Sequence, residues 1–246
     1  MNRRLFVASS IASLGLAGCA QAKTALTTGP FRKVLDAAET VNYRVIGTRG
    51  MARLYTDADV NVQFRLNGLN TPADTLYSSL AARGFLQYEL AIGGLVDRPQ
   101  RFSFAQLRAM PQQTQITRLD CVEGWSQIGK WRGVPLAAIL ALAHPKPEAR
   151  YVVFRSFNSD DQGTPFYGSL DLHEAAHPQT ILALDLNDKP LDLDHGAPVR
   201  LRIPTQLGYK STKWVSRIDV LASFAHIGAG NGGYWEDQGY EWYAGI

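Results

Sequence analysis

The sequence predicts a mixed α+β domain that is rich in strands. Polar and apolar residues alternate in several short runs, which is the periodicity of a strand with one buried face. Helical patterns are short, and neither a regular βαβ alternation nor a repeat of fixed period appears along the chain. Together these observations predict one strand-rich mixed sheet domain without a clear linker.

The first half of the chain contains one surface segment and three elements. Residues 23–60 lack a strong periodicity and are expected to wrap the surface. Residues 87–92 alternate as a strand, and Gly93-Gly94 is expected to form the turn after it. Residues 104–110 form a short helix candidate, and residues 115–119 alternate as a strand that runs directly into Cys121.

The second half adds one helix and three strands. Residues 136–143 form an apolar helix, which His144-Pro145 ends. Residues 151–154 have the composition of a buried strand, residues 199–203 alternate as a strand, and residues 213–222 form another.

The composition is that of an ordinary globular protein. The chain has 246 residues, 46% hydrophobic and 19% charged, so the apolar surface is ample to offset the entropy of ordering the chain. The formal net charge is +3, and the loss of Arg3 and Arg4 with an N-terminal signal would lower it to +1. So small a charge carries no electrostatic footprint for DNA or RNA, and we expect no nucleic-acid partner.

Residues 1–22 are expected to form an export signal, which leaves residues 23–246 as the single mature domain. Arg3-Arg4 precedes a run of small and apolar residues that is too short to span a bilayer as a permanent helix. Arg3-Arg4 followed by Leu5-Phe6 fits the twin-arginine type of signal, which carries folded proteins. The sequence before Cys19 resembles a lipobox, and residues 20–22 equally fit an ordinary cleavage site. We therefore expect a periplasmic protein, either soluble or attached to the membrane only through a lipid anchor.

The mature domain contains a single thiol, Cys121, so it cannot form an internal disulfide. A lone cysteine is usually a small buried apolar residue. Cys121, however, ends a predicted strand and opens a loop with Gly124 and Trp125, where a ligand could approach and a soft metal could use the thiolate.

Two further segments carry groups with chemistry. His173, Glu174 and His177 spell HExxH, the zinc-protease spacing, but Pro178 cuts the helix short, and a short amphipathic surface helix is the simpler interpretation. Four basic residues lie within fourteen positions, where guanidinium groups and loop N–H groups could bind a phosphate: Arg200, Arg202, Lys210 and Lys213. On charge count alone, a solvated basic face is the expected role of this cluster.

Three segments, taken together, resemble one family. Residues 119–136 (LDCVEGWSQIGKWRGVPL) resemble the molybdenum-binding segment of the sulfite oxidase-type molybdopterin enzymes, and residues 193–220 resemble their cofactor-binding stretch. Residues 166–172 (FYGSLDL) resemble the segment that brings a tyrosine into the active site. The resemblance runs from about residue 60 to 222 and implies the family's strand-rich fold.

The resemblance also implies roles for individual residues. Cys121 would be the protein ligand to molybdenum in a molybdenum–molybdopterin cofactor, and Tyr167 would lie near the substrate. The remaining implied cofactor-binding residues are Asn67, Ser156, His195, Arg200, Ser211, Thr212 and Lys213. At the Arg-Asn-His segment of the family this chain has Leu66-Asn67-Gly68, so the arginine expected to hold sulfite is replaced, although Arg65 is adjacent.

The implied function is oxygen-atom transfer on a small sulfur-oxide substrate, either sulfite-like or sulfoxide-like. No C-x-x-C-H motif is present, so no heme is expected and electrons would be exchanged with a separate cytochrome or quinone-linked membrane subunit. Two alternatives remain at this point: a cofactor-free exported binding lipoprotein, and a zinc hydrolase that uses His173, Glu174 and His177. The aromatic segment 232–246 is expected to pack against the domain rather than line a pocket.

Overall fold

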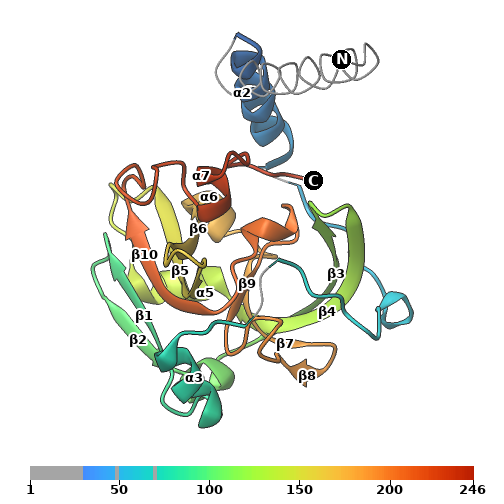
Figure 1. Ribbon diagram of the computed structural model, residues 1–246, viewed down its shortest axis with the longest axis vertical. Coiled ribbons are helices and arrows are strands. Elements are labelled where there is room, and N and C mark those ends of the chain that lie inside the picture. The colour runs from blue at the N-terminus through green and yellow to red at the C-terminus, as the bar shows by residue number, and fades with distance from the viewer. Residues whose placement is uncertain (1–29, 48–49, 69–70) are drawn as a thin grey trace, which may run out of the picture. The chain divides into compact units, whose positions relative to one another are not determined.

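The computed structural model describes residues 30–47, 50–68 and 71–246 (Figure 1). The chain divides into two units, residues 1–45 and 46–246. The described part of the first unit is helix α2 (Pro30–Asn42), and the π-helical turn η1 (Tyr43–Gly47) follows it. Residues 23–60 lack a strong periodicity in the sequence, yet residues 30–42 form this helix. The predicted export signal and Cys19 lie outside the described residues, so the predicted domain boundaries stay a prediction.

The first sheet of the second unit is mixed. Its strand order is β2 (Gln100–Ser103), β1 (Glu89–Gly94), β10 (Val215–Leu221), β5 (Tyr151–Ser159) and β6 (Pro165–Asp171). Strand β1 pairs parallel with β10, and the other neighbours pair antiparallel. Gly93-Gly94 belongs to β1 and does not form the predicted turn. A Cβ at Gly94 would lie 2.2 Å from the Val220 carbonyl oxygen, so only glycine allows this approach between the strands.

The second sheet is antiparallel. Its order is β3 (Gln113–Cys121), β4 (Trp125–Pro135), β7 (Ile181–Leu186) and β8 (Lys189–Pro190), and β9 (Arg200–Arg202) also pairs with β7. The long hairpin of β3 and β4 pairs Gln113 with Gly133 at one end and Cys121 with Trp125 at the other. Cys121 therefore lies at the tip of a regular ladder, where the backbone fixes its position.

Short helices complete the fold. They are η2 (Asp57–Asp59), α3 (Thr75–Ala82), α4 (Phe104–Ala109), α5 (Leu136–Ala143), α6 (Leu172–Ala175), η3 (Gly208–Lys210) and α7 (Tyr234–Asp237). The predicted helix at 136–143 is confirmed, and the left-handed backbone of His144 ends it. Within the described ranges, no helix is long and apolar enough to cross a membrane.

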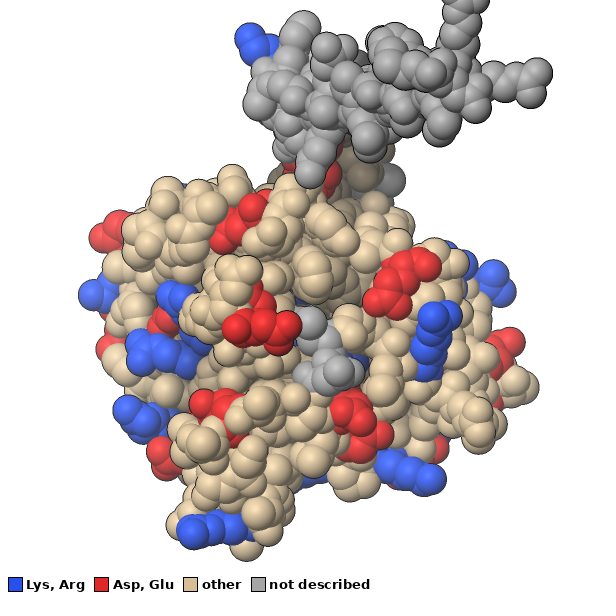
Figure 2. Space-filling model, in the orientation of Figure 1, with Lys and Arg blue, Asp and Glu red and all other residues tan. Residues whose placement is uncertain are grey.

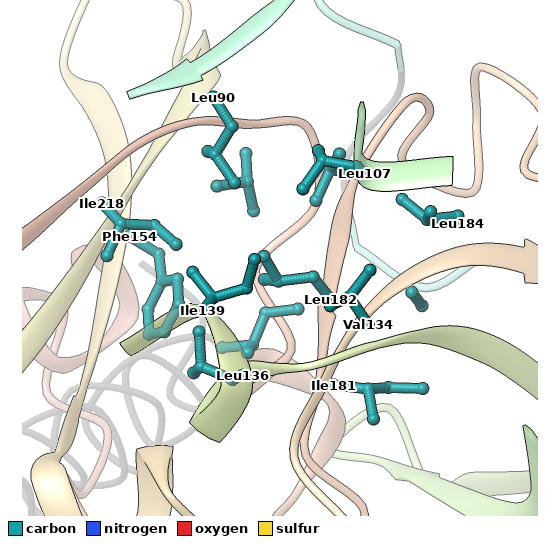
Figure 3. Close-up of a cluster of buried hydrophobic side chains, with 14 of the residues drawn as sticks. Leu90, Leu107, Val134, Leu136, Ile139, Phe154, Ile181, Leu182, Leu184 and Ile218 are labelled. Atoms are coloured by element: carbon teal, nitrogen blue, oxygen red, sulfur yellow. The ribbon is translucent and has the colours of Figure 1, made fainter. Parts of the chain in front are cut away.

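The two sheets share one apolar core (Figure 3). Leu136 and Ile139 of α5 lie between Phe154 of β5 and Leu182 of β7, so this helix fills the space between the sheets. All four side chains are fully buried, and each such side chain contributes roughly 1.5–3 kcal/mol relative to an exposed position. The predicted strand-rich α+β fold class is confirmed.

Candidate active site

One cavity of about 140 Å³ gathers most of the predicted site residues. Its walls come from the tip of the β3–β4 hairpin, from β5 and β6, and from the loop between η3 and β10. Seven of the nine predicted site residues line it: Asn67, Cys121, Ser156, Tyr167, Ser211, Thr212 and Lys213. Segments from five parts of the sequence therefore converge on the only thiol in the described residues.

Cys121 is half-buried at the end of β3. The turn that follows it is closed by a hydrogen bond from the Gly124 N–H to the Cys121 carbonyl, 3.1 Å long, and Gly124 has a φ of +84°, which favours glycine. Burial raises the pKa of the Cys121 thiol above its ordinary value. Since a metal binds the thiolate, the thiol would lose its proton on coordination.

Two neighbours of Cys121 were not assigned roles from the sequence. The Glu123 carboxylate accepts hydrogen bonds from the Trp125 indole N–H at 2.8 Å and from the Gly68 N–H at 3.2 Å. These bonds, that from Trp125 foremost, lower the pKa of Glu123. The Arg65 guanidinium lies 5.0 Å from the centre of the Trp125 ring. Glu123 lies within residues 119–136, the segment that resembles the family's molybdenum-binding segment. Its position in the turn directly after Cys121 is the one signal in the sequence that could have identified it as a site residue.

The basic cluster is buried, so the expectation of a solvated face is wrong. Arg200 and Arg202 are fully buried, and their guanidinium carbons lie 5.1 Å and 5.4 Å from the Trp131 ring centre. Lys210 and Lys213 are 3% and 8% exposed. The alternation of residues 199–203 suggested one solvent-exposed face, but all three residues of β9 are buried.

The charges of the two arginines are not neutralised by carboxylates. Arg200 donates to the Asn67 side-chain oxygen at 2.9 Å and to the His195 carbonyl at 3.1 Å, both of which are neutral acceptors. Among the described residues, no carboxylate forms an ion pair with Arg200 or Arg202. The Nε atoms of both are buried without a hydrogen-bond partner. Burial lowers the pKa of Arg200 to about 10 and that of Arg202 to about 9.

Lys213 adds a third buried cation at the cavity itself. Burial, followed by repulsion from Arg200, lowers its pKa to about 7. Its ammonium donates to the Asp194 carbonyl at 3.0 Å and lies 4.1 Å from the Trp214 ring centre. A site with this much buried positive charge favours an anionic ligand.

His195 does not line the main cavity. It borders a second cavity of about 530 Å³, and its ring nitrogens lie 2.8 Å from the Asp192 carboxylate and 3.0 Å from the Phe64 carbonyl. Arg200 connects the two places, because it bonds both the His195 backbone and Asn67.

Ser156 and Tyr167 face the cavity in different ways. The Ser156 hydroxyl donates to the Lys213 carbonyl at 3.0 Å and so fixes the loop that carries Lys213. The Tyr167 hydroxyl lies 2.6 Å from the Asp237 carboxylate and 3.0 Å from the Ile227 carbonyl, so its polar end is held by neighbouring segments. Burial and then Asp237 raise its pKa, which keeps the hydroxyl protonated.

The C-terminal segment (residues 232–246) both packs and lines the cavity. Tyr243 and Ala244 are buried, as the packing prediction expects. Trp235 and Tyr240, however, line the same cavity as Cys121, so the expectation that this segment only packs is wrong.

The comparison with known protein families decides the identity of this fold. Residues 79–226, more than half of the chain, match a family described as the oxidoreductase molybdopterin binding domain. The chain belongs to this family. The resemblance to the sulfite oxidase-type enzymes is thus confirmed, and so is the enzyme class, molybdopterin-dependent oxidoreductase, at the level of the family.

Individual relatives agree with this membership. The YedZ1 protein of Azospira oryzae, named as a protein-methionine-sulfoxide reductase subunit, is 42% identical over 158 residues, covering 64% of this chain and 56% of YedZ1. The protein-methionine-sulfoxide reductase catalytic subunit MsrP of Xanthomonas axonopodis is 31% identical over 222 residues, covering 84% of this chain and 65% of MsrP. The chain thus spans less than two thirds of the length of either relative.

A solved structure shares the fold. The sulfane dehydrogenase SoxCD of Paracoccus pantotrophus superimposes with a TM-score of 0.50 and 26% identity over 56% of this chain and 39% of that one.

The residues of the cavity fit a molybdopterin cofactor. Cys121 offers one soft donor at the cavity wall, which suits molybdenum, and the pterin would supply the other sulfur ligands. Lys213 places a buried cation at the cavity wall, and Arg200, which is bonded to Asn67, adds positive charge behind that wall. Neither Arg200 nor Arg202 lines the cavity itself. The donor set and the charge surplus therefore agree with the family's cofactor.

The zinc alternative is wrong. Helix α6 ends at Ala175, so His177 lies beyond it and the two histidines do not share a helix face. Glu174 is buried and accepts a hydrogen bond from the Gln206 amide at 2.9 Å, and the His177 ring lies 3.1 Å from the Gly50 carbonyl. The described residues contain no group of three metal-ligating side chains. Asp171 caps the helix, and Glu174 and His177 are buried, so the expected surface position of this helix is wrong for these two residues.

Proposed function

We propose that this chain is an exported molybdenum-cofactor oxidoreductase that reduces sulfoxides of the methionine type. The overall reaction takes up two electrons and two protons, breaks the sulfur–oxygen bond, and gives a thioether and water. The observation that carries this proposal is the convergence of Cys121, Asn67 and Lys213 on one cavity, beside the buried Arg200. The relatives named as methionine-sulfoxide reductase subunits support the choice of substrate.

Each residue has a proposed task. Bound molybdenum supplies two-electron oxygen-atom transfer chemistry, which no protein side chain provides. Cys121 would hold the metal, and the pterin and its phosphate would be held by Asn67, Ser156, His195, Arg200, Ser211, Thr212 and Lys213. The Tyr167 ring would face the substrate, while its hydroxyl stays bound to Asp237.

A neutral sulfoxide suits the rim of this cavity better than sulfite does. Position 66 carries the half-exposed Leu66, so it provides no cation for an oxyanion. The Glu123 carboxylate lines the cavity and would repel an anion. The nearby Arg65 lies against the Trp125 ring and does not line the cavity, so it does not replace the missing cation of position 66.

The electron partner and the location are part of the proposal. We propose a separate cytochrome or quinone-linked membrane subunit as the electron donor, because two relatives are named as subunits. The twin-arginine pattern at Arg3-Arg4 supports a periplasmic location, either soluble or lipid-anchored at Cys19.

A pair of assays tests the proposed reaction. Protein from cofactor-competent cells is given a short peptide with one methionine sulfoxide and a chemically reduced viologen dye, or sulfite and an electron acceptor dye. We expect oxidation of the viologen with the peptide, slower turnover of sulfite, and loss of both activities in Cys121→Ser. Faster turnover of sulfite than of the peptide, or unchanged turnover in Cys121→Ser, would overturn the proposal.

A further inference from the structure

One wall of the Cys121 cavity is aromatic, and the proposed cofactor chemistry does not use it. Phe166, Tyr209, Trp235 and Tyr240 line the cavity together with Cys121. Figure 1 shows α7, which carries Trp235, beside β6, which carries Phe166, and the contacts between the two elements agree. We call these four rings the aromatic wall.

The rings of the aromatic wall touch one another in a continuous row. The ring centres of Phe166 and Trp235 are 6.2 Å apart, and Trp235 stacks on Tyr240 at 5.6 Å with an angle of 27°. Tyr240 meets Tyr209 edge-on at 5.1 Å. The aromatic wall therefore runs from β6 across the C-terminal segment to η3. These three segments lie apart in the sequence but line the same cavity.

The aromatic wall is held from behind by buried polar contacts. Glu236, next to Trp235, forms a buried ion pair with Lys210. Asp237 accepts from the Tyr167 hydroxyl and, at 3.0 Å, from the Ala229 N–H. The Tyr209 hydroxyl donates to the Glu241 carbonyl at 2.6 Å. The rings are therefore fixed before any ligand arrives, and binding costs little further ordering.

Part of the surface of the aromatic wall is exposed. Tyr240 is 38% exposed and Trp235 is half-buried, although both are large rings in contact with other aromatics. Aromatic rings fixed at the mouth of a cavity with one face open provide apolar contact area for a ligand. They would contact the methylene groups of an organosulfur side chain, whereas a small hydrated oxyanion has no apolar surface to place against them.

We infer that the aromatic wall, through Trp235 and Tyr240, binds the organic part of the substrate and selects an organosulfur side chain over a small oxyanion. This inference rests on the proposed sulfoxide reduction and names the chain's specificity-determining residues for it. The remaining walls carry Asn67, Cys121 and Lys213, so polar and apolar parts of one ligand would meet different sides of the cavity.

The test compares two substrates on four variants. The substrates are a short peptide with one methionine sulfoxide and dimethyl sulfoxide, which has the same sulfur–oxygen group with the smallest organic part. The variants are Trp235→Ala, Tyr240→Ala, the conservative Trp235→Phe, and Tyr55→Ala. Tyr55 is a half-buried ring that lines neither of the two cavities described above and serves as the matched control.

We expect Trp235→Ala and Tyr240→Ala to raise KM for the peptide about tenfold, with kcat and molybdenum content within about twofold of the unmodified protein. KM for dimethyl sulfoxide should change less than about threefold, Trp235→Phe should recover most of the peptide affinity, and Tyr55→Ala should change neither KM. Equal effects on both substrates, or a loss of molybdenum that matches the loss of activity, would overturn the inference.

Calorimetric titration with the same peptide separates this inference from the proposed function, because it needs no turnover. Peptide binding that weakens about tenfold in Trp235→Ala supports the wall even if the unmodified protein reduces no sulfoxide, in which case only the proposed function fails. If the unmodified protein reduces the peptide but both alanine variants bind it with unchanged affinity, the proposed function holds and the inference about the aromatic wall is overturned. Unmodified protein that neither binds nor reduces the peptide overturns both.

Discussion

Lys213 is a buried lysine, and two effects disfavour its positive charge: its burial and the nearby Arg200 guanidinium. With a pKa of about 7 against an ordinary 10.5, it binds fewer protons in the folded chain than in the unfolded chain between these two pH values. The free energy of unfolding of cofactor-free protein should therefore rise with pH across this window, by at most about 1.4 kcal/mol per pH unit, and the penalty is fully present below pH 7.

The variant Lys213→Met isolates this contribution. Denaturant unfolding of cofactor-free protein at pH 7, 8 and 9 should give a smaller rise with pH in Lys213→Met than in the unmodified chain. Equal slopes in the two proteins would contradict the buried-cation account.

Tyr167 can be tested through its hydroxyl. Because that hydroxyl is held by Asp237, Tyr167→Phe should lower the free energy of unfolding by roughly 1.5–3 kcal/mol, the value of a hydrogen bond to a charged group, and leave kcat within about threefold. Urea unfolding and steady-state kinetics check both parts. A hundredfold loss of kcat at unchanged stability would instead assign proton transfer to the hydroxyl.

At the scale of elements, the C-terminal segment is tied to η3 by the Lys210–Glu236 pair. The two side chains are only 2% and 3% exposed, so Glu236→Gln leaves a buried ammonium without its carboxylate. We expect it to cost about 3–5 kcal/mol of unfolding free energy, and the double variant Lys210→Met/Glu236→Leu to recover most of that loss. Equal destabilisation in the single and double variants would show that the ion pair does not tie the segment to η3.

The elements that sequence reasoning predicts well are those whose pattern is local. The helix at 136–143 and the strand that ends at Cys121 follow from their own apolar periodicity and punctuation. The pair Gly93-Gly94 predicts a turn in the sequence, but the reason for a glycine there is the Val220 backbone of a strand more than a hundred residues away. The burial of Arg200 and Arg202 was missed for a similar cause, since charge alone favours solvent and only the β7 pairing and Trp131 place them inside.

The candidate site shows the same division. Its polar residues are recognisable as motifs in the sequence, and the fold brings seven of the nine to one cavity. The sequence assigns neither Glu123 nor the aromatic wall to the site. For the aromatic wall the reason is that no spacing rule connects Phe166 to Tyr240. Their association depends on how α7 packs against β6.

At the scale of the whole molecule, the drawn surface is mixed in charge, whereas one buried region is basic. On the face drawn in Figure 2, acidic and basic side chains are interspersed, whereas Arg200, Arg202 and Lys213 are buried near one another. An anionic cofactor bound there would offset the cost of burying these cations, so folding and cofactor binding should stabilise each other.

The most direct test of the central claim is the metal and pterin content of protein purified from cofactor-competent cells. Mass spectrometry for metals, with a fluorescence assay for released pterin, should find about one molybdenum and one pterin per chain, because one thiolate and one cationic pocket form a single site. Protein that carries zinc in place of molybdenum, or neither metal nor pterin, would contradict the account.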